Sequence, residues 1–194
     1  MSDQQAPVGG GVVALLLIDL QNAYFEDPQL AEALPSLIDH ANQLIEAARS
    51  ADRPVILVRT VHARDGSTWT LNMREDGEGF AYPGSHQAAY VDGLDVGDAL
   101  DVIKTRDNAF HRTELRDVLA GLGVGRLLIG GVSTHSCVVQ TAMAAFAEDL
   151  EVAIAAGSIA SENEELADAA LTFLSEEMRQ PVLDQRAALA FLRG

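Results

Sequence analysis

A strand that runs into a helix is encoded by residues 126–146. Its first part is a short apolar run followed by a small polar turn, Arg126-Leu127-Leu128-Ile129-Gly130-Gly131-Val132-Ser133-Thr134-His135-Ser136-Cys137-Val138-Val139. The apolar run is typical of a buried parallel strand. After the turn, the residues of one helical face recur at the required spacing, namely Val138, Thr141, Ala142, Ala145 and Phe146. We therefore expect Cys137 at or near the start of a helix.

Two interpretations of Cys137, the only cysteine of the chain, are open. A lone cysteine is commonly a small buried hydrophobic residue. At a helix start, however, the free amides and the positive end of the helix dipole favour a thiolate. The same turn can also aim backbone N–H groups at a developing oxyanion. The position is therefore that of a candidate nucleophile, and a single cysteine excludes a disulfide within the chain.

The remaining chain alternates predicted strands with predicted helices. Strands are expected at 12–18, 54–58, 101–104, 126–129 and 151–156, with an edge strand at 181–183. Helices are expected to begin at Pro35, at Thr113, at the capping box Ser161-Glu162-Asn163-Glu164 and after the cap Asp184. This order predicts an α/β fold in which a parallel sheet carries helices on both faces.

One domain is expected to span residues 1–194, because neither a repeat nor a linker divides the chain. Residues 1–10 are expected to form a flexible arm. Residues 60–98 form a long irregular stretch that holds the only tryptophan, Trp69. Loops of this length inside a compact domain are usually functional or disordered, and the aromatic residues argue against disorder. A substrate lid and a subunit contact are both open.

The composition restricts the class of function. The chain has 194 residues, of which 48% are hydrophobic, and a formal net charge of −16 at pH 7. Nucleic acids and anionic membrane surfaces bind clusters of Lys and Arg, so this charge argues against both as partners. Residues 1–11 lack the pattern of a signal peptide, and no apolar run is long enough to span a bilayer. We expect a cytoplasmic protein.

Three polar residues stand where buried strands end: Asp19, Lys104 and Cys137. The carboxyl ends of parallel strands lie along one edge of the sheet, so these side chains can meet in one crevice. There Asp19 could accept the thiol proton, and Lys104 could orient that carboxylate and lower the pKa of the thiol. Two alternatives remain, since Asp19 could cap the next segment or form a structural ion pair with Lys104 beside an inert cysteine.

Three stretches of the sequence resemble the signatures of the isochorismatase-like cysteine hydrolases. They are residues 15–25, residues 102–110 and residues 130–138. The resemblance covers about Val12 to Ser161, with the stretches in the family's order. It implies a three-layer α/β/α sandwich and a catalytic triad, which falls on Asp19, Lys104 and Cys137. It also implies a cis peptide between Val132 and Ser133, with the amides of Ser133 and Cys137 forming an oxyanion hole.

The resemblance also has departures that bear on the reaction. Nicotinamidase-like members carry an Asp-x-His metal motif, but Thr60 stands where the aspartate is expected, two residues before His62. We therefore expect no metal and no cofactor. Members that cleave the vinyl ether of isochorismate can lack the cysteine, so the presence of Cys137 favours a covalent attack on an amide. Residues 67–72 are similar to a subgroup that includes streptothricin hydrolase, which opens a lactam.

The sequence thus predicts a metal-independent cysteine hydrolase that cleaves the amide or lactam C–N bond of a small molecule. The predicted substrate contacts are Gln21, Phe25, Trp69, Phe110, Thr134, His135 and Ser136. For the aromatic residues the alternative is core packing, and for His135 it is a place in the turn. A vinyl ether hydrolase, a metal-dependent nicotinamidase and a non-catalytic binding module are the alternative functions. We expect a homodimer or a homotetramer.

Overall fold

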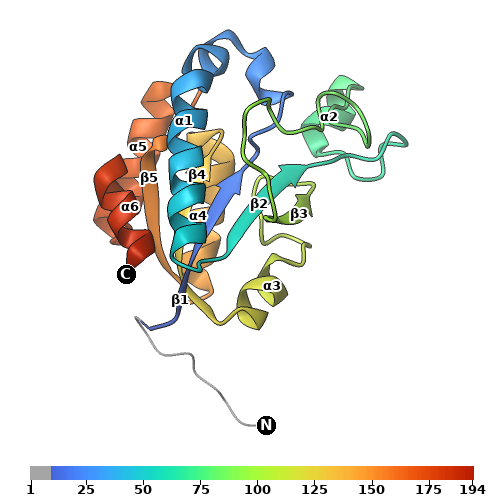
Figure 1. Ribbon diagram of the computed structural model, residues 1–194. Coiled ribbons are helices and arrows are strands. Elements are labelled where there is room, and N and C mark those ends of the chain that lie inside the picture. Colours follow the sequence, from blue (N-terminus) through green and yellow to red (C-terminus); the bar gives the residue numbers. More distant parts are fainter. Residues whose placement is uncertain (1–9) are drawn as a thin grey trace.

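The computed structural model describes residues 10–194, so the predicted arm lies mostly outside the described residues. Its strands form one six-stranded sheet in the order β3-β2-β1-β4-β5-β6, and every neighbouring pair is parallel. The strands are β1 (Val12–Ile18), β2 (Val55–Thr60), β3 (Leu100–Lys104), β4 (Val124–Gly131), β5 (Glu151–Ile159) and β6 (Val182–Leu183). The predicted α/β class with a parallel sheet is confirmed (Figure 1).

Helices cover both faces of this sheet. The helices are α1 (Pro28–Ser50), α2 (Leu71–Asp76), α3 (Leu115–Gly121), α4 (Val139–Ala147), α5 (Glu164–Glu177) and α6 (Gln185–Arg193). A short 3-10 turn, η1 (Tyr24–Glu26), and a π-helical turn, η2 (Thr134–Val138), complete the elements. Alternate residues of β1 face opposite ways, so Leu15 packs with residues of α1 and α6, whereas Leu16 packs with residues of α3, α4 and α5. The result is the three-layer α/β/α sandwich.

Two predicted helix starts are wrong, and α3 begins at Leu115, two residues after the predicted start at Thr113. The first long helix begins at Pro28 rather than Pro35, because the Asp27 carboxylate caps it by accepting hydrogen bonds from the amides of Gln29 and Leu30. Pro35 therefore lies inside α1. The predicted capping box does not form either, since Asn163 caps α5 by accepting from the Leu166 amide. The predicted cap Asp184 is confirmed at α6.

Segment 60–98 packs against the edge of the sheet where the strands end. It contains α2, which lies beyond the arrowhead of β2 in Figure 1. Its backbone is tied to the end of β1, because the Val91 amide donates to the Leu20 carbonyl and Gln21 pairs with Tyr90 in an isolated bridge. Within the described residues, no helix is both long and apolar enough to cross a membrane.

Candidate active site

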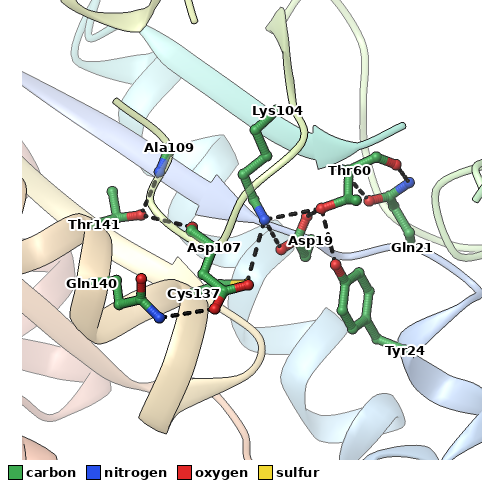
Figure 2. A network of polar contacts seen from close by, with 10 residues as sticks. All are labelled: Asp19, Gln21, Tyr24, Thr60, Lys104, Asp107, Ala109, Cys137, Gln140 and Thr141. Atoms are coloured by element: carbon green, nitrogen blue, oxygen red, sulfur yellow. Dashed lines mark hydrogen bonds and ion pairs between the residues drawn. The ribbon is translucent and has the colours of Figure 1, made fainter. Parts of the chain in front are cut away.

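Three predicted residues meet at the carboxyl edge of the sheet. The Lys104 ammonium lies 2.6 Å from an Asp19 carboxylate oxygen and 3.3 Å from the Cys137 sulfur (Figure 2). Lys104 ends β3, Asp19 follows β1, and Cys137 lies in η2, so the convergence follows from the parallel sheet. All three side chains are almost completely buried. Lys104 and Cys137 are also the only lysine and the only cysteine of the chain.

Thr60, at the end of β2, hydrogen-bonds to both members of the Lys104–Asp19 ion pair. Its hydroxyl donates to Asp19 at 3.0 Å and accepts from Lys104 at 2.9 Å and from the Tyr24 hydroxyl at 2.9 Å. Gln21 in turn fixes the Thr60 backbone, since its side-chain oxygen accepts from the Thr60 amide at 2.7 Å and its nitrogen donates to the Thr60 carbonyl at 2.9 Å. Figure 2 shows this network beside the thiol.

The turn before Cys137 requires a glycine and contains a cis peptide bond. Gly131 has φ +119°, and a Cβ atom there would lie 2.0 Å from the Ile18 carbonyl oxygen. The peptide bond between Val132 and Ser133 is cis. Among residues 10–194, the Ser133 amide has no hydrogen-bond acceptor, whereas the neighbouring Thr134 amide donates to Ala160. A free amide in the turn that leads to Cys137 is the kind of donor that an oxyanion needs.

Asp107 adds a second carboxylate to the site, which the sequence analysis missed. One oxygen lies 3.9 Å from the Cys137 sulfur, and the other accepts from the Gln140 side chain at 2.8 Å. Its position three residues after Lys104, within residues 102–110, is the feature of the sequence that could have identified it. Thr60 was missed as well, although it ends a predicted strand at the same edge of the sheet.

The electrostatics of the thiol differ from the prediction. Burial raises the pKa of Cys137, the carboxylates of Asp19 and Asp107 raise it further, and Lys104 lowers it without offsetting them. The expected lowering of this pKa is therefore wrong for the resting site. Burial lowers the pKa of Lys104, but Asp19 and Cys137 outweigh it and the net pKa is raised. The resting pair is thus a protonated thiol beside a charged ammonium.

A cavity of about 150 Å³ opens beside this cluster. Its wall contains Thr60 and Asp107, which contact the cluster, together with Tyr24, His62, Thr70, Met73, Phe80, Thr105 and Arg106. The Phe80 ring packs edge-on against Tyr24 at 5.9 Å between centroids and lies 5.4 Å from the His62 ring. His62, Thr70, Met73 and Phe80 all come from segment 60–98, so this segment builds most of the wall.

The side chains predicted to contact substrate lie elsewhere. Gln21 is fully buried and spends its amide on backbone groups, which makes it a positioning residue. Phe25 packs against the core on the α1 side, and Phe110 against the core on the α4 side. The Trp69 indole N–H donates to the Ala63 carbonyl at 3.0 Å.

The polar residues of the turn also point to other partners. The Thr134 hydroxyl donates to Ala160, and the His135 ring lies 2.6 Å from the Ser161 hydroxyl. The Ser133 hydroxyl donates to Glu162, and Ser136 is half-buried. None of the predicted substrate contacts lines the cavity.

The surroundings of His62 bear on whether this site could bind a metal ion. His62 is buried, with its Nδ1 3.2 Å from the Thr68 carbonyl oxygen. Burial lowers the pKa of His62, and the charges of Arg106 and Lys104 add to the effect. Within the part of the chain that the structure describes, no group of three His, Cys, Asp or Glu residues has the geometry of a metal site. The cation beside the thiol in this arrangement is Lys104.

Comparisons with known proteins show similar sequences and a similar fold. A "probable inactive nicotinamidase" of Arabidopsis thaliana is 34% identical over 144 residues, which cover 70% of this chain and 74% of that protein. Streptothricin hydrolase of Streptomyces noursei is 31% identical over 141 residues, covering 69% of this chain but 44% of that protein. The crystal structure of an isochorismatase family protein from Desulfovibrio vulgaris superposes with a TM-score of 0.84, at 26% identity, over 95% of this chain and all of that one.

The family comparison covers most of the described residues. The isochorismatase domain matches residues 13–186, from the first buried strand to the start of α6. All three site residues and all of the sheet except Val12 lie within the matched range. The chain therefore belongs to the isochorismatase family.

Proposed function

We propose that this chain is a cysteine hydrolase that cleaves the amide or lactam C–N bond of a small molecule through a thioester. The observation that carries the proposal is the contact of a buried thiol with a buried Lys–Asp pair beside a small cavity. Streptothricin hydrolase and nicotinamidase, named among the relatives, are hydrolases by name. An inert core cysteine would need neither a charged partner nor a cavity.

The proposed chemistry follows from the protonation states. The thiol enters the reaction protonated, so its proton passes to Asp19 as the sulfur–carbon bond forms. The oxyanion that develops on the carbonyl oxygen is bound by the amides of Ser133 and Cys137. Asp19 then gives its proton to the nitrogen as the C–N bond breaks, which leaves a thioester and a free amine. Water attacks the thioester, Asp19 accepts a proton from it, and the acid leaves as the thiol re-forms.

Lys104 keeps its charge throughout this cycle. Its ammonium contacts both Asp19 and the sulfur, so it stabilises whichever of the two is negative. Asp107 adds negative charge near the sulfur, which disfavours a free thiolate. The thiol therefore loses its proton only as the sulfur bonds to a carbonyl carbon. The proposal therefore needs no stable thiolate in the free protein.

The decisive experiment is a panel of amides, lactams and ureides, with isochorismate as the test of the vinyl ether alternative. We expect turnover of a carbonyl–nitrogen compound, complete loss in Cys137→Ala, and an adduct of the acyl mass on wild-type protein after rapid quenching. Since Cys137 is the only cysteine, the adduct reports on one site. Turnover in Cys137→Ala would overturn the covalent mechanism. Binding without turnover across the panel would favour the non-catalytic module, as the name of the Arabidopsis relative suggests for that protein.

A further inference from the structure

The cavity beside the thiol contains one arginine, Arg106, whose charge has no acidic partner. The chain carries 29 acidic residues, yet Arg106 forms no ion pair with any described residue. Its guanidinium is instead held by backbone oxygens. One terminal nitrogen donates to the Thr68 carbonyl at 2.7 Å and to the Thr105 carbonyl at 2.5 Å, and the other donates to the Trp69 carbonyl at 3.3 Å.

These contacts leave part of the guanidinium unused. The group has five N–H donors in a fixed plane. Within the described residues, the three bonds to carbonyls leave the Nε–H and one terminal N–H without an acceptor. A half-buried cation that lacks a counter-ion is costly, and paired N–H groups of arginine match the two oxygens of a carboxylate. The carbonyls hold the side chain while the remaining donors suit an anion.

The other residues of the cavity wall limit the kind of ligand that the cavity can hold. Among the lining residues, Asp107 lies 3.9 Å from the Cys137 sulfur and Thr60 contacts Lys104, and Arg106 supplies the positive charge of the wall. His62 is kept neutral by burial, which lowers its pKa, so it does not compete for an anion. Met73, Phe80 and Tyr24 add apolar surface to the wall. A volume of about 150 Å³ lies below the range of drug-sized sites, so the ligand is small.

We propose, on the basis of the function proposed above, that the substrate is a small amide carrying a carboxylate, which Arg106 binds while the amide carbon faces Cys137. Arg106 is then the residue that sets specificity for an anionic substrate. The carboxylates of Asp19 and Asp107 near the sulfur repel the charged end of such a substrate, which prevents the reversed orientation.

The test compares two substrates that differ in one charge, succinamic acid and succinamide. We expect wild type to prefer the acid, and Arg106→Gln to lose tenfold or more in kcat/KM for the acid, mainly through KM, with little change for succinamide. Arg106→Lys keeps the charge and is expected to lose less. Arg64→Gln is the matched control, because Arg64 is an arginine of segment 60–98 that stacks on Tyr82 without lining the cavity. An equal loss for both substrates would assign Arg106 to loop anchoring and overturn the proposal.

A second arm measures binding without turnover. Succinate should protect Cys137 from iodoacetamide, a neutral reagent, in wild type and in Arg64→Gln but not in Arg106→Gln, with thermal melting used to verify folding. Equal protection of wild type and Arg106→Gln, or none in either, would overturn the carboxylate site. Protection that depends on Arg106, without hydrolysis of any amide, would support the carboxylate site and overturn the proposed function instead. Hydrolysis of succinamide and succinamic acid at equal kcat/KM would support the proposed function and overturn the carboxylate site.

Discussion

Two ion pairs link strands of the same sheet and differ in burial. Arg59–Asp101 joins the neighbouring strands β2 and β3, whereas Lys104–Asp19 connects the end of β3 to the residue after β1, across β2. Lys104 and Asp19 meet at 2.6 Å with side chains that are 1% and 0% exposed, whereas Arg59 and Asp101 meet at 2.7 Å with 27% and 40% exposed. Exposed pairs add little to stability, because water and salt screen them. A buried pair costs desolvation, which apolar residues of the same size would avoid. The buried pair therefore supports the proposed chemistry rather than a stabilising role.

The largest expected effect separates the two pairs by stability. Lys104→Met leaves the Asp19 charge buried without a partner, and we expect a loss of about 3–5 kcal/mol in the free energy of unfolding. Arg59→Met breaks the exposed pair and is expected to cost about 1 kcal/mol or less. Urea denaturation of both variants measures the difference. If the two variants lost equal stability, the comparison between the pairs would fail.

The pH dependence and a double variant sharpen the same prediction. The pKa of Lys104 is raised above its ordinary 10.5, so the stability that its charge contributes is present below that pH and is lost as the pH rises through the higher folded value. Asp19→Asn with Lys104→Met removes both charges, and we expect it to recover most of the stability lost in Lys104→Met. A double variant as unstable as Lys104→Met would show that the loss came from packing.

A smaller but more specific effect concerns the reactivity of Cys137. Its pKa is raised, so at neutral pH it should react with iodoacetamide more slowly than a free cysteine, with a rate that rises with pH. Asp19→Asn removes a charge that raises this pKa and should speed the reaction, while abolishing hydrolysis. Lys104→Met removes the charge that lowers it and should slow the reaction. Asp101→Asn, in the exposed pair, should leave the rate unchanged. Shifts of Asp19→Asn and Lys104→Met in the same direction would contradict this account.

The smallest expected effect is that of chelation. Lys104 supplies the positive charge beside the thiol, so hydrolysis should be unchanged after treatment with EDTA and dialysis. Activity that falls on chelation and returns with zinc or iron would place a metal in the site. It would then assign His62, the buried histidine of segment 60–98, a different role.

The sequence predicted which residues would converge where a residue ends or follows a buried strand. Asp19 and Lys104 follow or end apolar runs, and parallel strands bring those ends to one edge. The residues of the cavity wall could not be identified from the sequence, because an aromatic residue in a loop has no periodic signal. Phe25 and Phe110 pack against the core, whereas Phe80, which the sequence gives no reason to prefer, lines the cavity.

The alternation of apolar strands and amphipathic helices is a local property, so the sequence alone establishes the α/β class and the edge at which a site forms. Local patterns also place the thiol at a strand-to-helix turn. The charge state of that thiol depends on groups distant in the chain, since Asp19, Thr60 and Asp107 approach the Lys104–Cys137 contact only after folding. That the guanidinium of Arg106 has no acidic partner is likewise visible only in three dimensions. The packing of segment 60–98 brings backbone carbonyls to Arg106 and no carboxylate.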